Sequence, residues 1–218
     1  MARSNSKKQP PKPTTVLLVR HGQTPTTGKV LPGRAKGLYL GDKGIAQAER
    51  AGERIASLDR VNAIYASPME RTQQTAAPIA KATKLRIRTR AGLNECDFGK
   101  WTGRKLSDLR KLPEWQTVQR YPSGFRFPGG ESFAEMQARI TGTIVDLVAD
   151  HPGETIVCVS HADTIKAAVA HAVGTHLDQF QRIVISPCSI SAIVYTAGGP
   201  IVLAVNSTGD DLKALVPS

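Results

Sequence analysis

The chain has 218 residues, of which 40% are hydrophobic and 22% charged, and it carries a formal net charge of +11. These values predict one α/β-sized domain with an ordinary buried core and exclude a chain too polar to bury one. The basic balance attracts anions such as phosphorylated metabolites, nucleic acid or acidic lipid, although a diffuse excess of cations most often serves solubility.

The first predicted elements follow a polar start. Residues 1–13 hold four cations and three prolines, with no large apolar residue after Met1, so we expect a disordered basic tail. Residues 14–19 form a short apolar run that predicts a buried strand. A loop rich in Thr, Gly and Pro leads to a helix that is expected to begin at Asp42. Residues 14–218 show no repeat and no convincing boundary, which favours a single domain.

A second strand is predicted at residues 63–66, directly before Ser67. Ser67 is expected to cap a helix, because Pro68 suits the first helical position and Glu70 completes a capping box. Arg71 then lies in the first helical turn, close to free backbone N–H groups.

The second half of the chain continues to alternate strand and helix signals. Ser132 and Glu135 form another capping box, before a helical stripe that ends near Pro152. The other helices are expected near 105–111 and 114–120 and at 164–173. The other strands are expected at 85–88, 155–160, 183–185, 190–195 and 201–205, the last three with antiparallel character. This alternation predicts an α/β three-layer sandwich with a mostly parallel, mixed central sheet.

Two of the apolar runs end on a histidine. Residues 16–19 lead into Arg20 and His21, and residues 156–159 lead into Ser160 and His161. Ligands of open α/β sheets bind in the crevice at the carboxyl ends of the strands. Two imidazoles at that edge, one beside an arginine, indicate a site that attacks or grips an anion.

Five segments carry a resemblance to a known family. Residues 20–24 (Arg-His-Gly-Gln-Thr) resemble the signature of the histidine phosphatase superfamily, branch 1, the phosphoglycerate mutase-like group. Four further segments resemble motifs of the family, in family order: 67–76, 93–103, 128–132 and 160–161. The pattern is also similar to uncharacterised actinobacterial members. The resemblance implies a phosphoglycerate mutase-like fold.

The resemblance and the chemistry of the residues assign the same roles. His21 is expected to attack phosphorus and hold the phosphoryl group, with its other ring nitrogen fixed by a backbone carbonyl. Arg20 and Arg71 offer charged planar groups to phosphoryl oxygens, and His161 is expected to donate a further hydrogen bond. Gly22 is expected to leave room for the chain to turn beside the anion.

Proton transfer and specificity fall to other positions. Glu95 matches the acid/base carboxyl group of the family, a role that calls for a raised pKa. Asp163 also lies near a predicted strand end and could share this role. The remaining candidate phosphate- or substrate-binding residues are Thr24, Thr27, Arg34 and Ala162. Thr27 stands where many members have asparagine, and Ala162-Asp163 stands where glycine-containing pairs are common. No metal or other cofactor is expected.

These features predict a metal-independent phosphomonoesterase that acts through phosphohistidine on a small phosphorylated metabolite. A mutase, such as a cofactor-dependent phosphoglycerate mutase, is the alternative within the family. The stretch 99–130 is shorter than in a typical mutase and lacks its adjacent Arg-Arg pair, which favours the phosphatase. A non-catalytic phosphate- or polyanion-binding module is the alternative outside it.

The cysteines and apolar runs bear on compartment and partners. Cys96, Cys158 and Cys188 show no CxxC spacing, which is typical of a reduced, cytoplasmic protein. No apolar run reaches the length of a membrane span, and no signal peptide is evident. We therefore expect a small-molecule phosphoester as substrate, no nucleic-acid or membrane partner, and leave a homodimer open.

Overall fold

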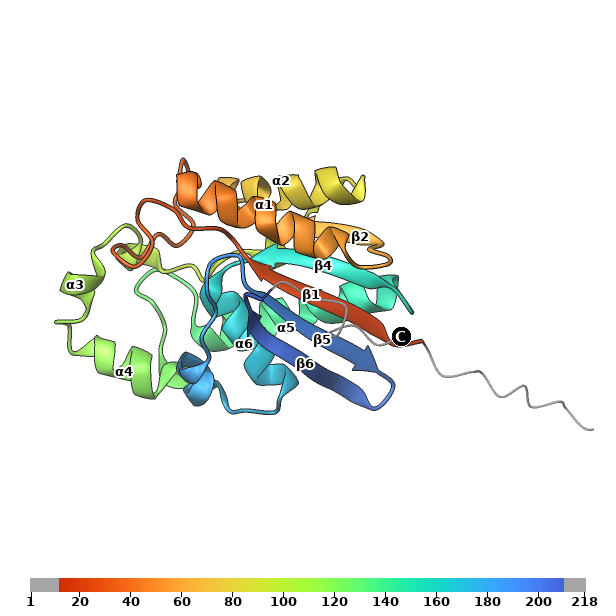
Figure 1. Cartoon of the computed structure of the whole chain (residues 1–218). Coiled ribbons are helices and arrows are strands. Elements are labelled where there is room, and N and C mark those ends of the chain that lie inside the picture. Colours follow the sequence, from red (N-terminus) through yellow and green to blue (C-terminus); the bar gives the residue numbers. More distant parts are fainter. Residues whose placement is uncertain (1–11, 210–218) are drawn as a thin grey trace, which may run out of the picture.

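The computed structural model describes residues 12–209, and its centre is a six-stranded sheet in the order β3-β2-β4-β1-β5-β6 (Figure 1). The strands are β1 (Thr14–Arg20), β2 (Ala63–Ala66), β3 (Ile87–Thr89), β4 (Thr155–Ser160), β5 (Ile190–Thr196) and β6 (Gly199–Ser207). Strands β1 to β4 pair in parallel, whereas β5 and β6 close one edge with antiparallel pairing. Most of the expected basic tail, residues 1–11, lies outside the described residues.

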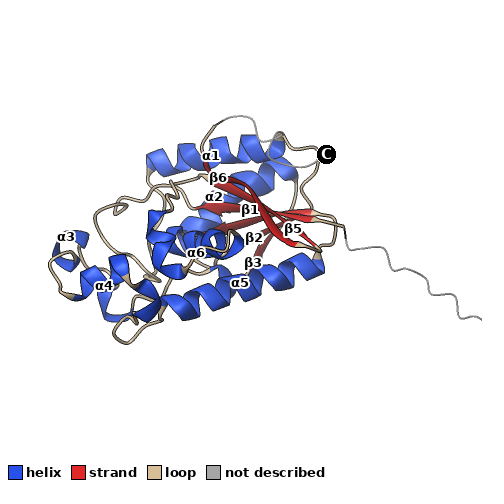
Figure 2. Ribbon diagram, turned by 90° about the horizontal axis from the view of Figure 1, so that it is seen from below, coloured by secondary structure: helices blue, strands red, loops and turns tan. Residues whose placement is uncertain are grey.

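Helices cover both faces of the sheet, as Figures 1 and 2 show from two directions. One face carries α1 (Asp42–Ala56) and α2 (Glu70–Thr83), and the other carries α5 (Phe133–Asp150) and α6 (Ala162–Ala172). The short helices α3 (Leu106–Leu109) and α4 (Glu114–Arg120) lie beyond the carboxyl ends of β1 and β4. Within residues 12–209, four 3₁₀ turns complete the helical elements: Ala91–Leu93, Gly99–Trp101, Pro122–Gly124 and Leu177–Arg182. The predicted three-layer α/β sandwich is confirmed.

Alternate side chains of β1 fill the two halves of the core. Leu17 and Val19 pack in the cluster that contains Ile55 of α1 and Ile79 of α2. Val16 and Leu18 point the other way, into the cluster formed with α5 and α6. Because successive strand residues face opposite sides, a central strand covered by helices on both faces is continuously apolar. This explains why the apolar run predicted β1 correctly.

Two local predictions were wrong. Ser67 does not cap α2. The helix begins at Glu70, and its N-cap residue is Met69, whose side chain makes no capping hydrogen bond. The hydroxyl group of Ser67 bonds elsewhere, as described below. Residues 183–185 do not form a strand, because the carbonyl of Ile185 accepts a hydrogen bond from Arg20 instead of pairing in the sheet. The second capping box, between Ser132 and Glu135, is confirmed at the start of α5.

None of the helices within residues 12–209 is long and apolar enough to cross a membrane.

Candidate active site

The register of β1 and β4 brings the two predicted histidines together. Arg20 pairs with Ser160 at the last rung, so His21 and His161 each follow directly after neighbouring strand ends. The backbone N–H of His21 donates to the carbonyl of Ser160 at 3.0 Å, which continues the pairing by one residue. The two ring centroids lie 5.2 Å apart with the planes at 63°. Both imidazoles are buried at the edge where α/β sheets bind ligands.

The environment of His21 leaves one ring nitrogen with a lone pair. Nδ1 lies 2.8 Å from the carbonyl oxygen of Gly22, so Nδ1 carries the proton and Nε2 does not. Burial, reinforced by the charges of Arg71 and Arg20, holds the pKa of His21 well below its ordinary value. A neutral imidazole with a fixed tautomer is the nucleophilic form of this side chain.

His161 is held at both ring nitrogens. Nη2 of Arg71 donates to Nδ1 at 3.1 Å, and Nε2 lies 2.9 Å from Oγ of Ser67. Ser67 in turn donates to Oδ1 of Asn94 at 2.9 Å, so its hydroxyl group accepts the Nε2 proton of His161. Burial and the charge of Arg71 hold the pKa of His161 well below its ordinary value. The chain of hydrogen bonds engages both nitrogens, and the bond from His161 to a phosphoryl group stays a prediction.

The two predicted arginines offer donors that the described residues do not use. Arg71, in the first turn of α2, is fully buried and donates from Nη2 to the carbonyl of Gly33 at 2.7 Å. Arg20 donates from Nη1 to the carbonyl of Ile185 at 2.6 Å. Within residues 12–209, Nε and Nη1 of Arg71 and Nε of Arg20 are buried without a hydrogen-bond partner. Unpaired buried donors are rare, and charged ones are suited to the oxygens of a bound oxyanion.

Glu95 is the buried carboxyl group beside this cluster. Its Oε1 accepts from the N–H of Cys96 and from Oγ1 of Thr164, both at 3.1 Å. Burial, followed by the negative charge of Asp163, raises the pKa of Glu95. A carboxyl group that stays protonated above its usual range can donate a proton to a leaving group.

Two basic side chains hold the backbone of Glu95 in place. Nε of Arg34 donates to the carbonyl of Glu95 at 2.9 Å, and Arg139 of α5 reaches the same oxygen at 3.3 Å. Both arginines also bind the carboxylate of Glu131. Arg34 does not line the cavity described below, because its guanidinium group faces Glu131 and Asp97. Sequence reasoning missed Glu131 and Arg139, although Glu131 lies inside one of the family motifs.

Gly22 is required by the close approach of α1. A Cβ atom at this position would lie 2.5 Å from the carbonyl oxygen of Gly44, and one at Gly44 would lie 2.0 Å from that of Gln23. The N–H of Gly22 also donates to Thr75 of α2 at 3.0 Å. Close packing against α1 therefore requires a glycine at this position, and its predicted role beside the anion stays a prediction.

A cavity of about 360 Å³ opens beside His21 and Glu95. The predicted residues Arg20, Thr24, Thr27, Ala162 and Asp163 also line it. Within the loop, Oγ1 of Thr27 accepts the backbone N–H of Thr24 at 2.9 Å and lies 3.0 Å from the hydroxyl of Thr24. Thr27 thus shapes the loop at the position where many members have an asparagine.

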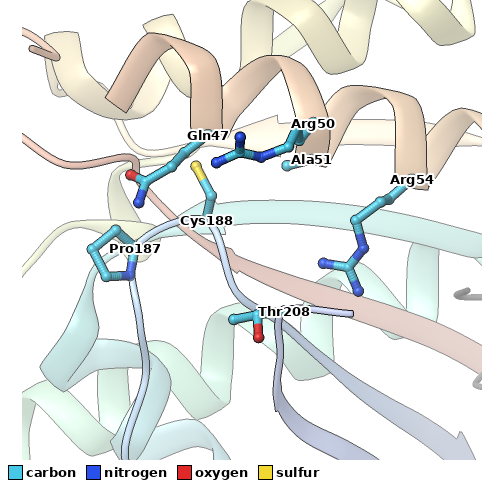
Figure 3. Close-up of a pocket in the computed structure, with 7 residues that line it drawn as sticks. All are labelled: Gln47, Arg50, Ala51, Arg54, Pro187, Cys188 and Thr208. Atoms are coloured by element: carbon cyan, nitrogen blue, oxygen red, sulfur yellow. The ribbon is translucent and has the colours of Figure 1, made fainter. Parts of the chain in front are cut away.

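A second hollow, of about 150 Å³, lies between α1 and the segment before β5 (Figure 3). Its lining residues are Gln47, Arg50, Ala51, Arg54, Pro187, Cys188 and Thr208. None of the predicted site residues is among them, although the N–H of Cys188 donates to the carbonyl of Arg20 at 3.1 Å. The candidate active site is therefore the cavity beside His21.

An α/β sandwich that gathers two imidazoles, two guanidinium groups and a carboxyl group at one sheet edge defines a phosphoryl-binding class of enzyme. Residues 16–208 match the family model of the histidine phosphatase superfamily (branch 1), and the chain belongs to this family.

Relatives of known name agree with this family. The chain is 29% identical over 198 residues to phosphoserine phosphatase 1 of Hydrogenobacter thermophilus, covering 88% of this chain and 92% of that protein. The structure of a phosphoserine phosphatase from Entamoeba histolytica, in complex with phosphoserine, is similar with a TM-score of 0.82 and 26% identity, covering 90% of this chain and 98% of that one. The mycobacterial glucosyl-3-phosphoglycerate phosphatase Rv2419c shares the fold, with a TM-score of 0.82 and 22% identity over 90% of this chain and 100% of that one. The family and the two phosphoserine phosphatases support a phosphoesterase activity.

Proposed function

We propose that the chain is a metal-independent phosphomonoesterase that hydrolyses a small phosphorylated metabolite through a phosphohistidine at His21. The observation that carries this proposal is the neutral imidazole of His21, with the Nε2 lone pair left available beside the unpaired donors of Arg20 and Arg71. Phosphoryl transfer depends mainly on positioning and on charge stabilisation, and these groups supply both.

The reaction runs in two displacements. Nε2 of His21 attacks phosphorus in line, the ester P–O bond breaks, and protonated Glu95 gives its proton to the departing oxygen. The carboxylate of Glu95 then takes a proton from water, whose oxygen attacks phosphorus and breaks the N–P bond. Inorganic phosphate leaves, and His21 and Glu95 return to their starting forms. Arg20 and Arg71 stabilise the charge on the phosphoryl oxygens in both steps.

The cavity favours hydrolysis over mutase chemistry. A mutase must hold a second phosphoryl group beside the first, which calls for additional cations. From the stretch 99–130, only Leu106 lines the cavity among the described residues. The cations of that stretch therefore supply no second anion site on the cavity wall.

The test is hydrolysis of p-nitrophenyl phosphate in EDTA, combined with acid-quench labelling from a ³²P-labelled ester. Wild type should turn over and become labelled on histidine, and His21→Ala should lose both properties. His171→Ala, on the exposed side of α6, should keep them and serves as the matched control. Undiminished turnover by His21→Ala would overturn the proposal. Interconversion of 3- and 2-phosphoglycerate that outpaces hydrolysis would favour the mutase instead.

A further inference from the structure

The charged groups of the active-site cavity are few, and most already have a task. Apart from His21, the ionisable residues that line it among residues 12–209 are Arg20, Glu95, Asp163 and Lys166. Arg20 serves the phosphoryl group and Glu95 serves proton transfer in the proposed reaction. Only Asp163 and Lys166 remain to meet the rest of the substrate.

Asp163 and Lys166 neutralise each other. They lie one turn apart on α6, with Nζ of Lys166 3.1 Å from Oδ1 of Asp163. Their side chains are only 18% and 17% exposed, so solvent screens this pair weakly. Nζ of Lys166 also donates to Oε1 of Gln181 at 3.0 Å and lies 5.9 Å from the ring centroid of Phe180. An anionic group of a substrate would have to compete with all three partners.

The rest of the wall is mainly apolar. The apolar lining residues are Val30, Leu31, Pro32, Phe98, Leu106, Ile183, Val184 and Ile185. They come from the loop after β1, from the stretch between β3 and α3 with the start of α3, and from the segment before β5. Such a wall desolvates a ligand and offers no cation to a negative charge on the leaving group, which makes binding of an anionic leaving group costly.

Arg34, a cation just outside the cavity lining, is also engaged. Arg34, the predicted rim residue, is committed to Glu131 at 3.0 Å and to the carbonyl of Glu95. It would have to abandon the backbone of the catalytic acid to reach a substrate.

We infer that this enzyme selects phosphomonoesters whose leaving group is uncharged and mainly apolar, and that the Asp163–Lys166 ion pair enforces the selection. The inference rests on the proposed function. Phosphorylated amino acids and phosphorylated carboxylic acids should therefore be poor substrates, because their leaving groups carry additional charge.

The experiment uses two esters of matched size, glycerol 3-phosphate and 3-phosphoglycerate. The first has a hydroxymethyl group where the second has a carboxylate. Wild type should show a kcat/KM at least about tenfold higher for glycerol 3-phosphate, and phenyl phosphate should be better still. Equal or better use of 3-phosphoglycerate would overturn the inference while leaving the phosphatase intact.

Asp163→Asn gives the sharper test, because it leaves the charge of Lys166 uncompensated beside the substrate. The ratio of kcat/KM values should then move toward 3-phosphoglycerate by about tenfold. The ratio is the readout, since Asp163 also raises the pKa of Glu95 and its loss changes the rate with both esters. Adding Lys166→Met should restore the preference for glycerol 3-phosphate. An unchanged ratio in Asp163→Asn would overturn the role of the ion pair.

The two levels of the proposal fail in different ways. Absence of both turnover and His21 labelling with all three esters would overturn the proposed function, and the inference with it. Labelling of His21 together with a preference for 3-phosphoglycerate would overturn the inference alone.

Discussion

Arg139 and Glu131 form a two-point ion pair, with Nε 2.8 Å from Oε1 and Nη2 2.9 Å from Oε2. Nη1 of the same arginine donates to the carbonyls of Gly92 and Asn94, and Nη2 reaches that of Glu95. A planar guanidinium group can bind a carboxylate and several carbonyls at once, whereas an ammonium group cannot do so in this geometry. The pair therefore fixes the backbone that carries the proposed acid.

Arg139→Met should lower kcat about 10- to 100-fold while changing KM little, because a displaced acid affects the chemical step more than binding. It should also lower the free energy of unfolding by about 3 kcal/mol, since Glu131 loses a partly buried partner. Steady-state kinetics and urea unfolding measure both effects. Arg139→Lys should recover part of the stability and little of kcat. Full activity in Arg139→Met would contradict the positioning role.

The pH dependence of kcat/KM should be set by two shifted groups. Activity should fall with rising pH through the raised pKa of Glu95, because the acid form is lost. On the acid side, activity should fall only where His21 becomes protonated, because the pKa of His21 lies well below its ordinary value. Glu95→Gln should lower the rate about 10²- to 10⁴-fold and remove the alkaline limb. An alkaline limb that survives in Glu95→Gln would assign it to another group.

Stability should decline on acidification because two buried histidines stay neutral. The folded-state pKa values of His21 and His161 are depressed, so their contribution is present above about pH 6.5 and lost as pH falls below it. Each adds up to about 1.4 kcal/mol per pH unit to the slope of unfolding free energy. Urea titrations between pH 7 and 5 should show a shallower slope in His161→Gln. His171→Ala, at an exposed position, should keep the wild-type slope.

Gly22→Ala should destabilise the fold by about 1–3 kcal/mol, because the added methyl group meets the carbonyl of Gly44. Gly142→Ala is the matched control. Gly142 lies inside α5 with nothing within 4 Å of an added Cβ, so this change should stabilise by about 0.5–1 kcal/mol. Thermal and urea unfolding of both variants check the pair. Equal stability of the two variants would show that α1 can shift away from the loop.

The fold was predictable where local chemistry decided it. Continuous apolar runs identified β1 and β4, and the reciprocal capping of Ser132 and Glu135 identified the start of α5. Ser67 presented the same local signal, but the predicted cap of α2 was wrong. The hydroxyl group of Ser67 bonds instead to His161, 94 positions away in sequence. A competing partner so distant is invisible in a local pattern. The strand predicted at residues 183–185 was wrong because these residues line the cavity, and an apolar cavity wall has the same composition as a buried strand.

The residues proposed to bear charge toward the phosphoryl group could be identified because motifs mark them, and the structure brings them together at one sheet edge. The residues that hold these groups in place could not be predicted from the sequence. Arg139 lies on a helix whose charged residues read as an ordinary solvent-facing side, and nothing local indicates that its guanidinium group turns toward the 92–95 segment. The engagement of Lys166 likewise depends on Gln181 from another element.

The two imidazoles follow directly after the last paired residues of neighbouring strands, so the strand pairing itself sets the spacing of their backbone positions. The loops that wall the cavity hold the rings in their orientation, through Gly22 and through Gly33 by way of Arg71, but do not set which backbone positions are neighbours. Insertions or exchanges in those loops can therefore alter which molecules enter while the bond-breaking apparatus keeps its dimensions. Wall residues that hold no reacting group, such as Val30 and Leu106, are the positions where such exchanges leave the reacting groups in place.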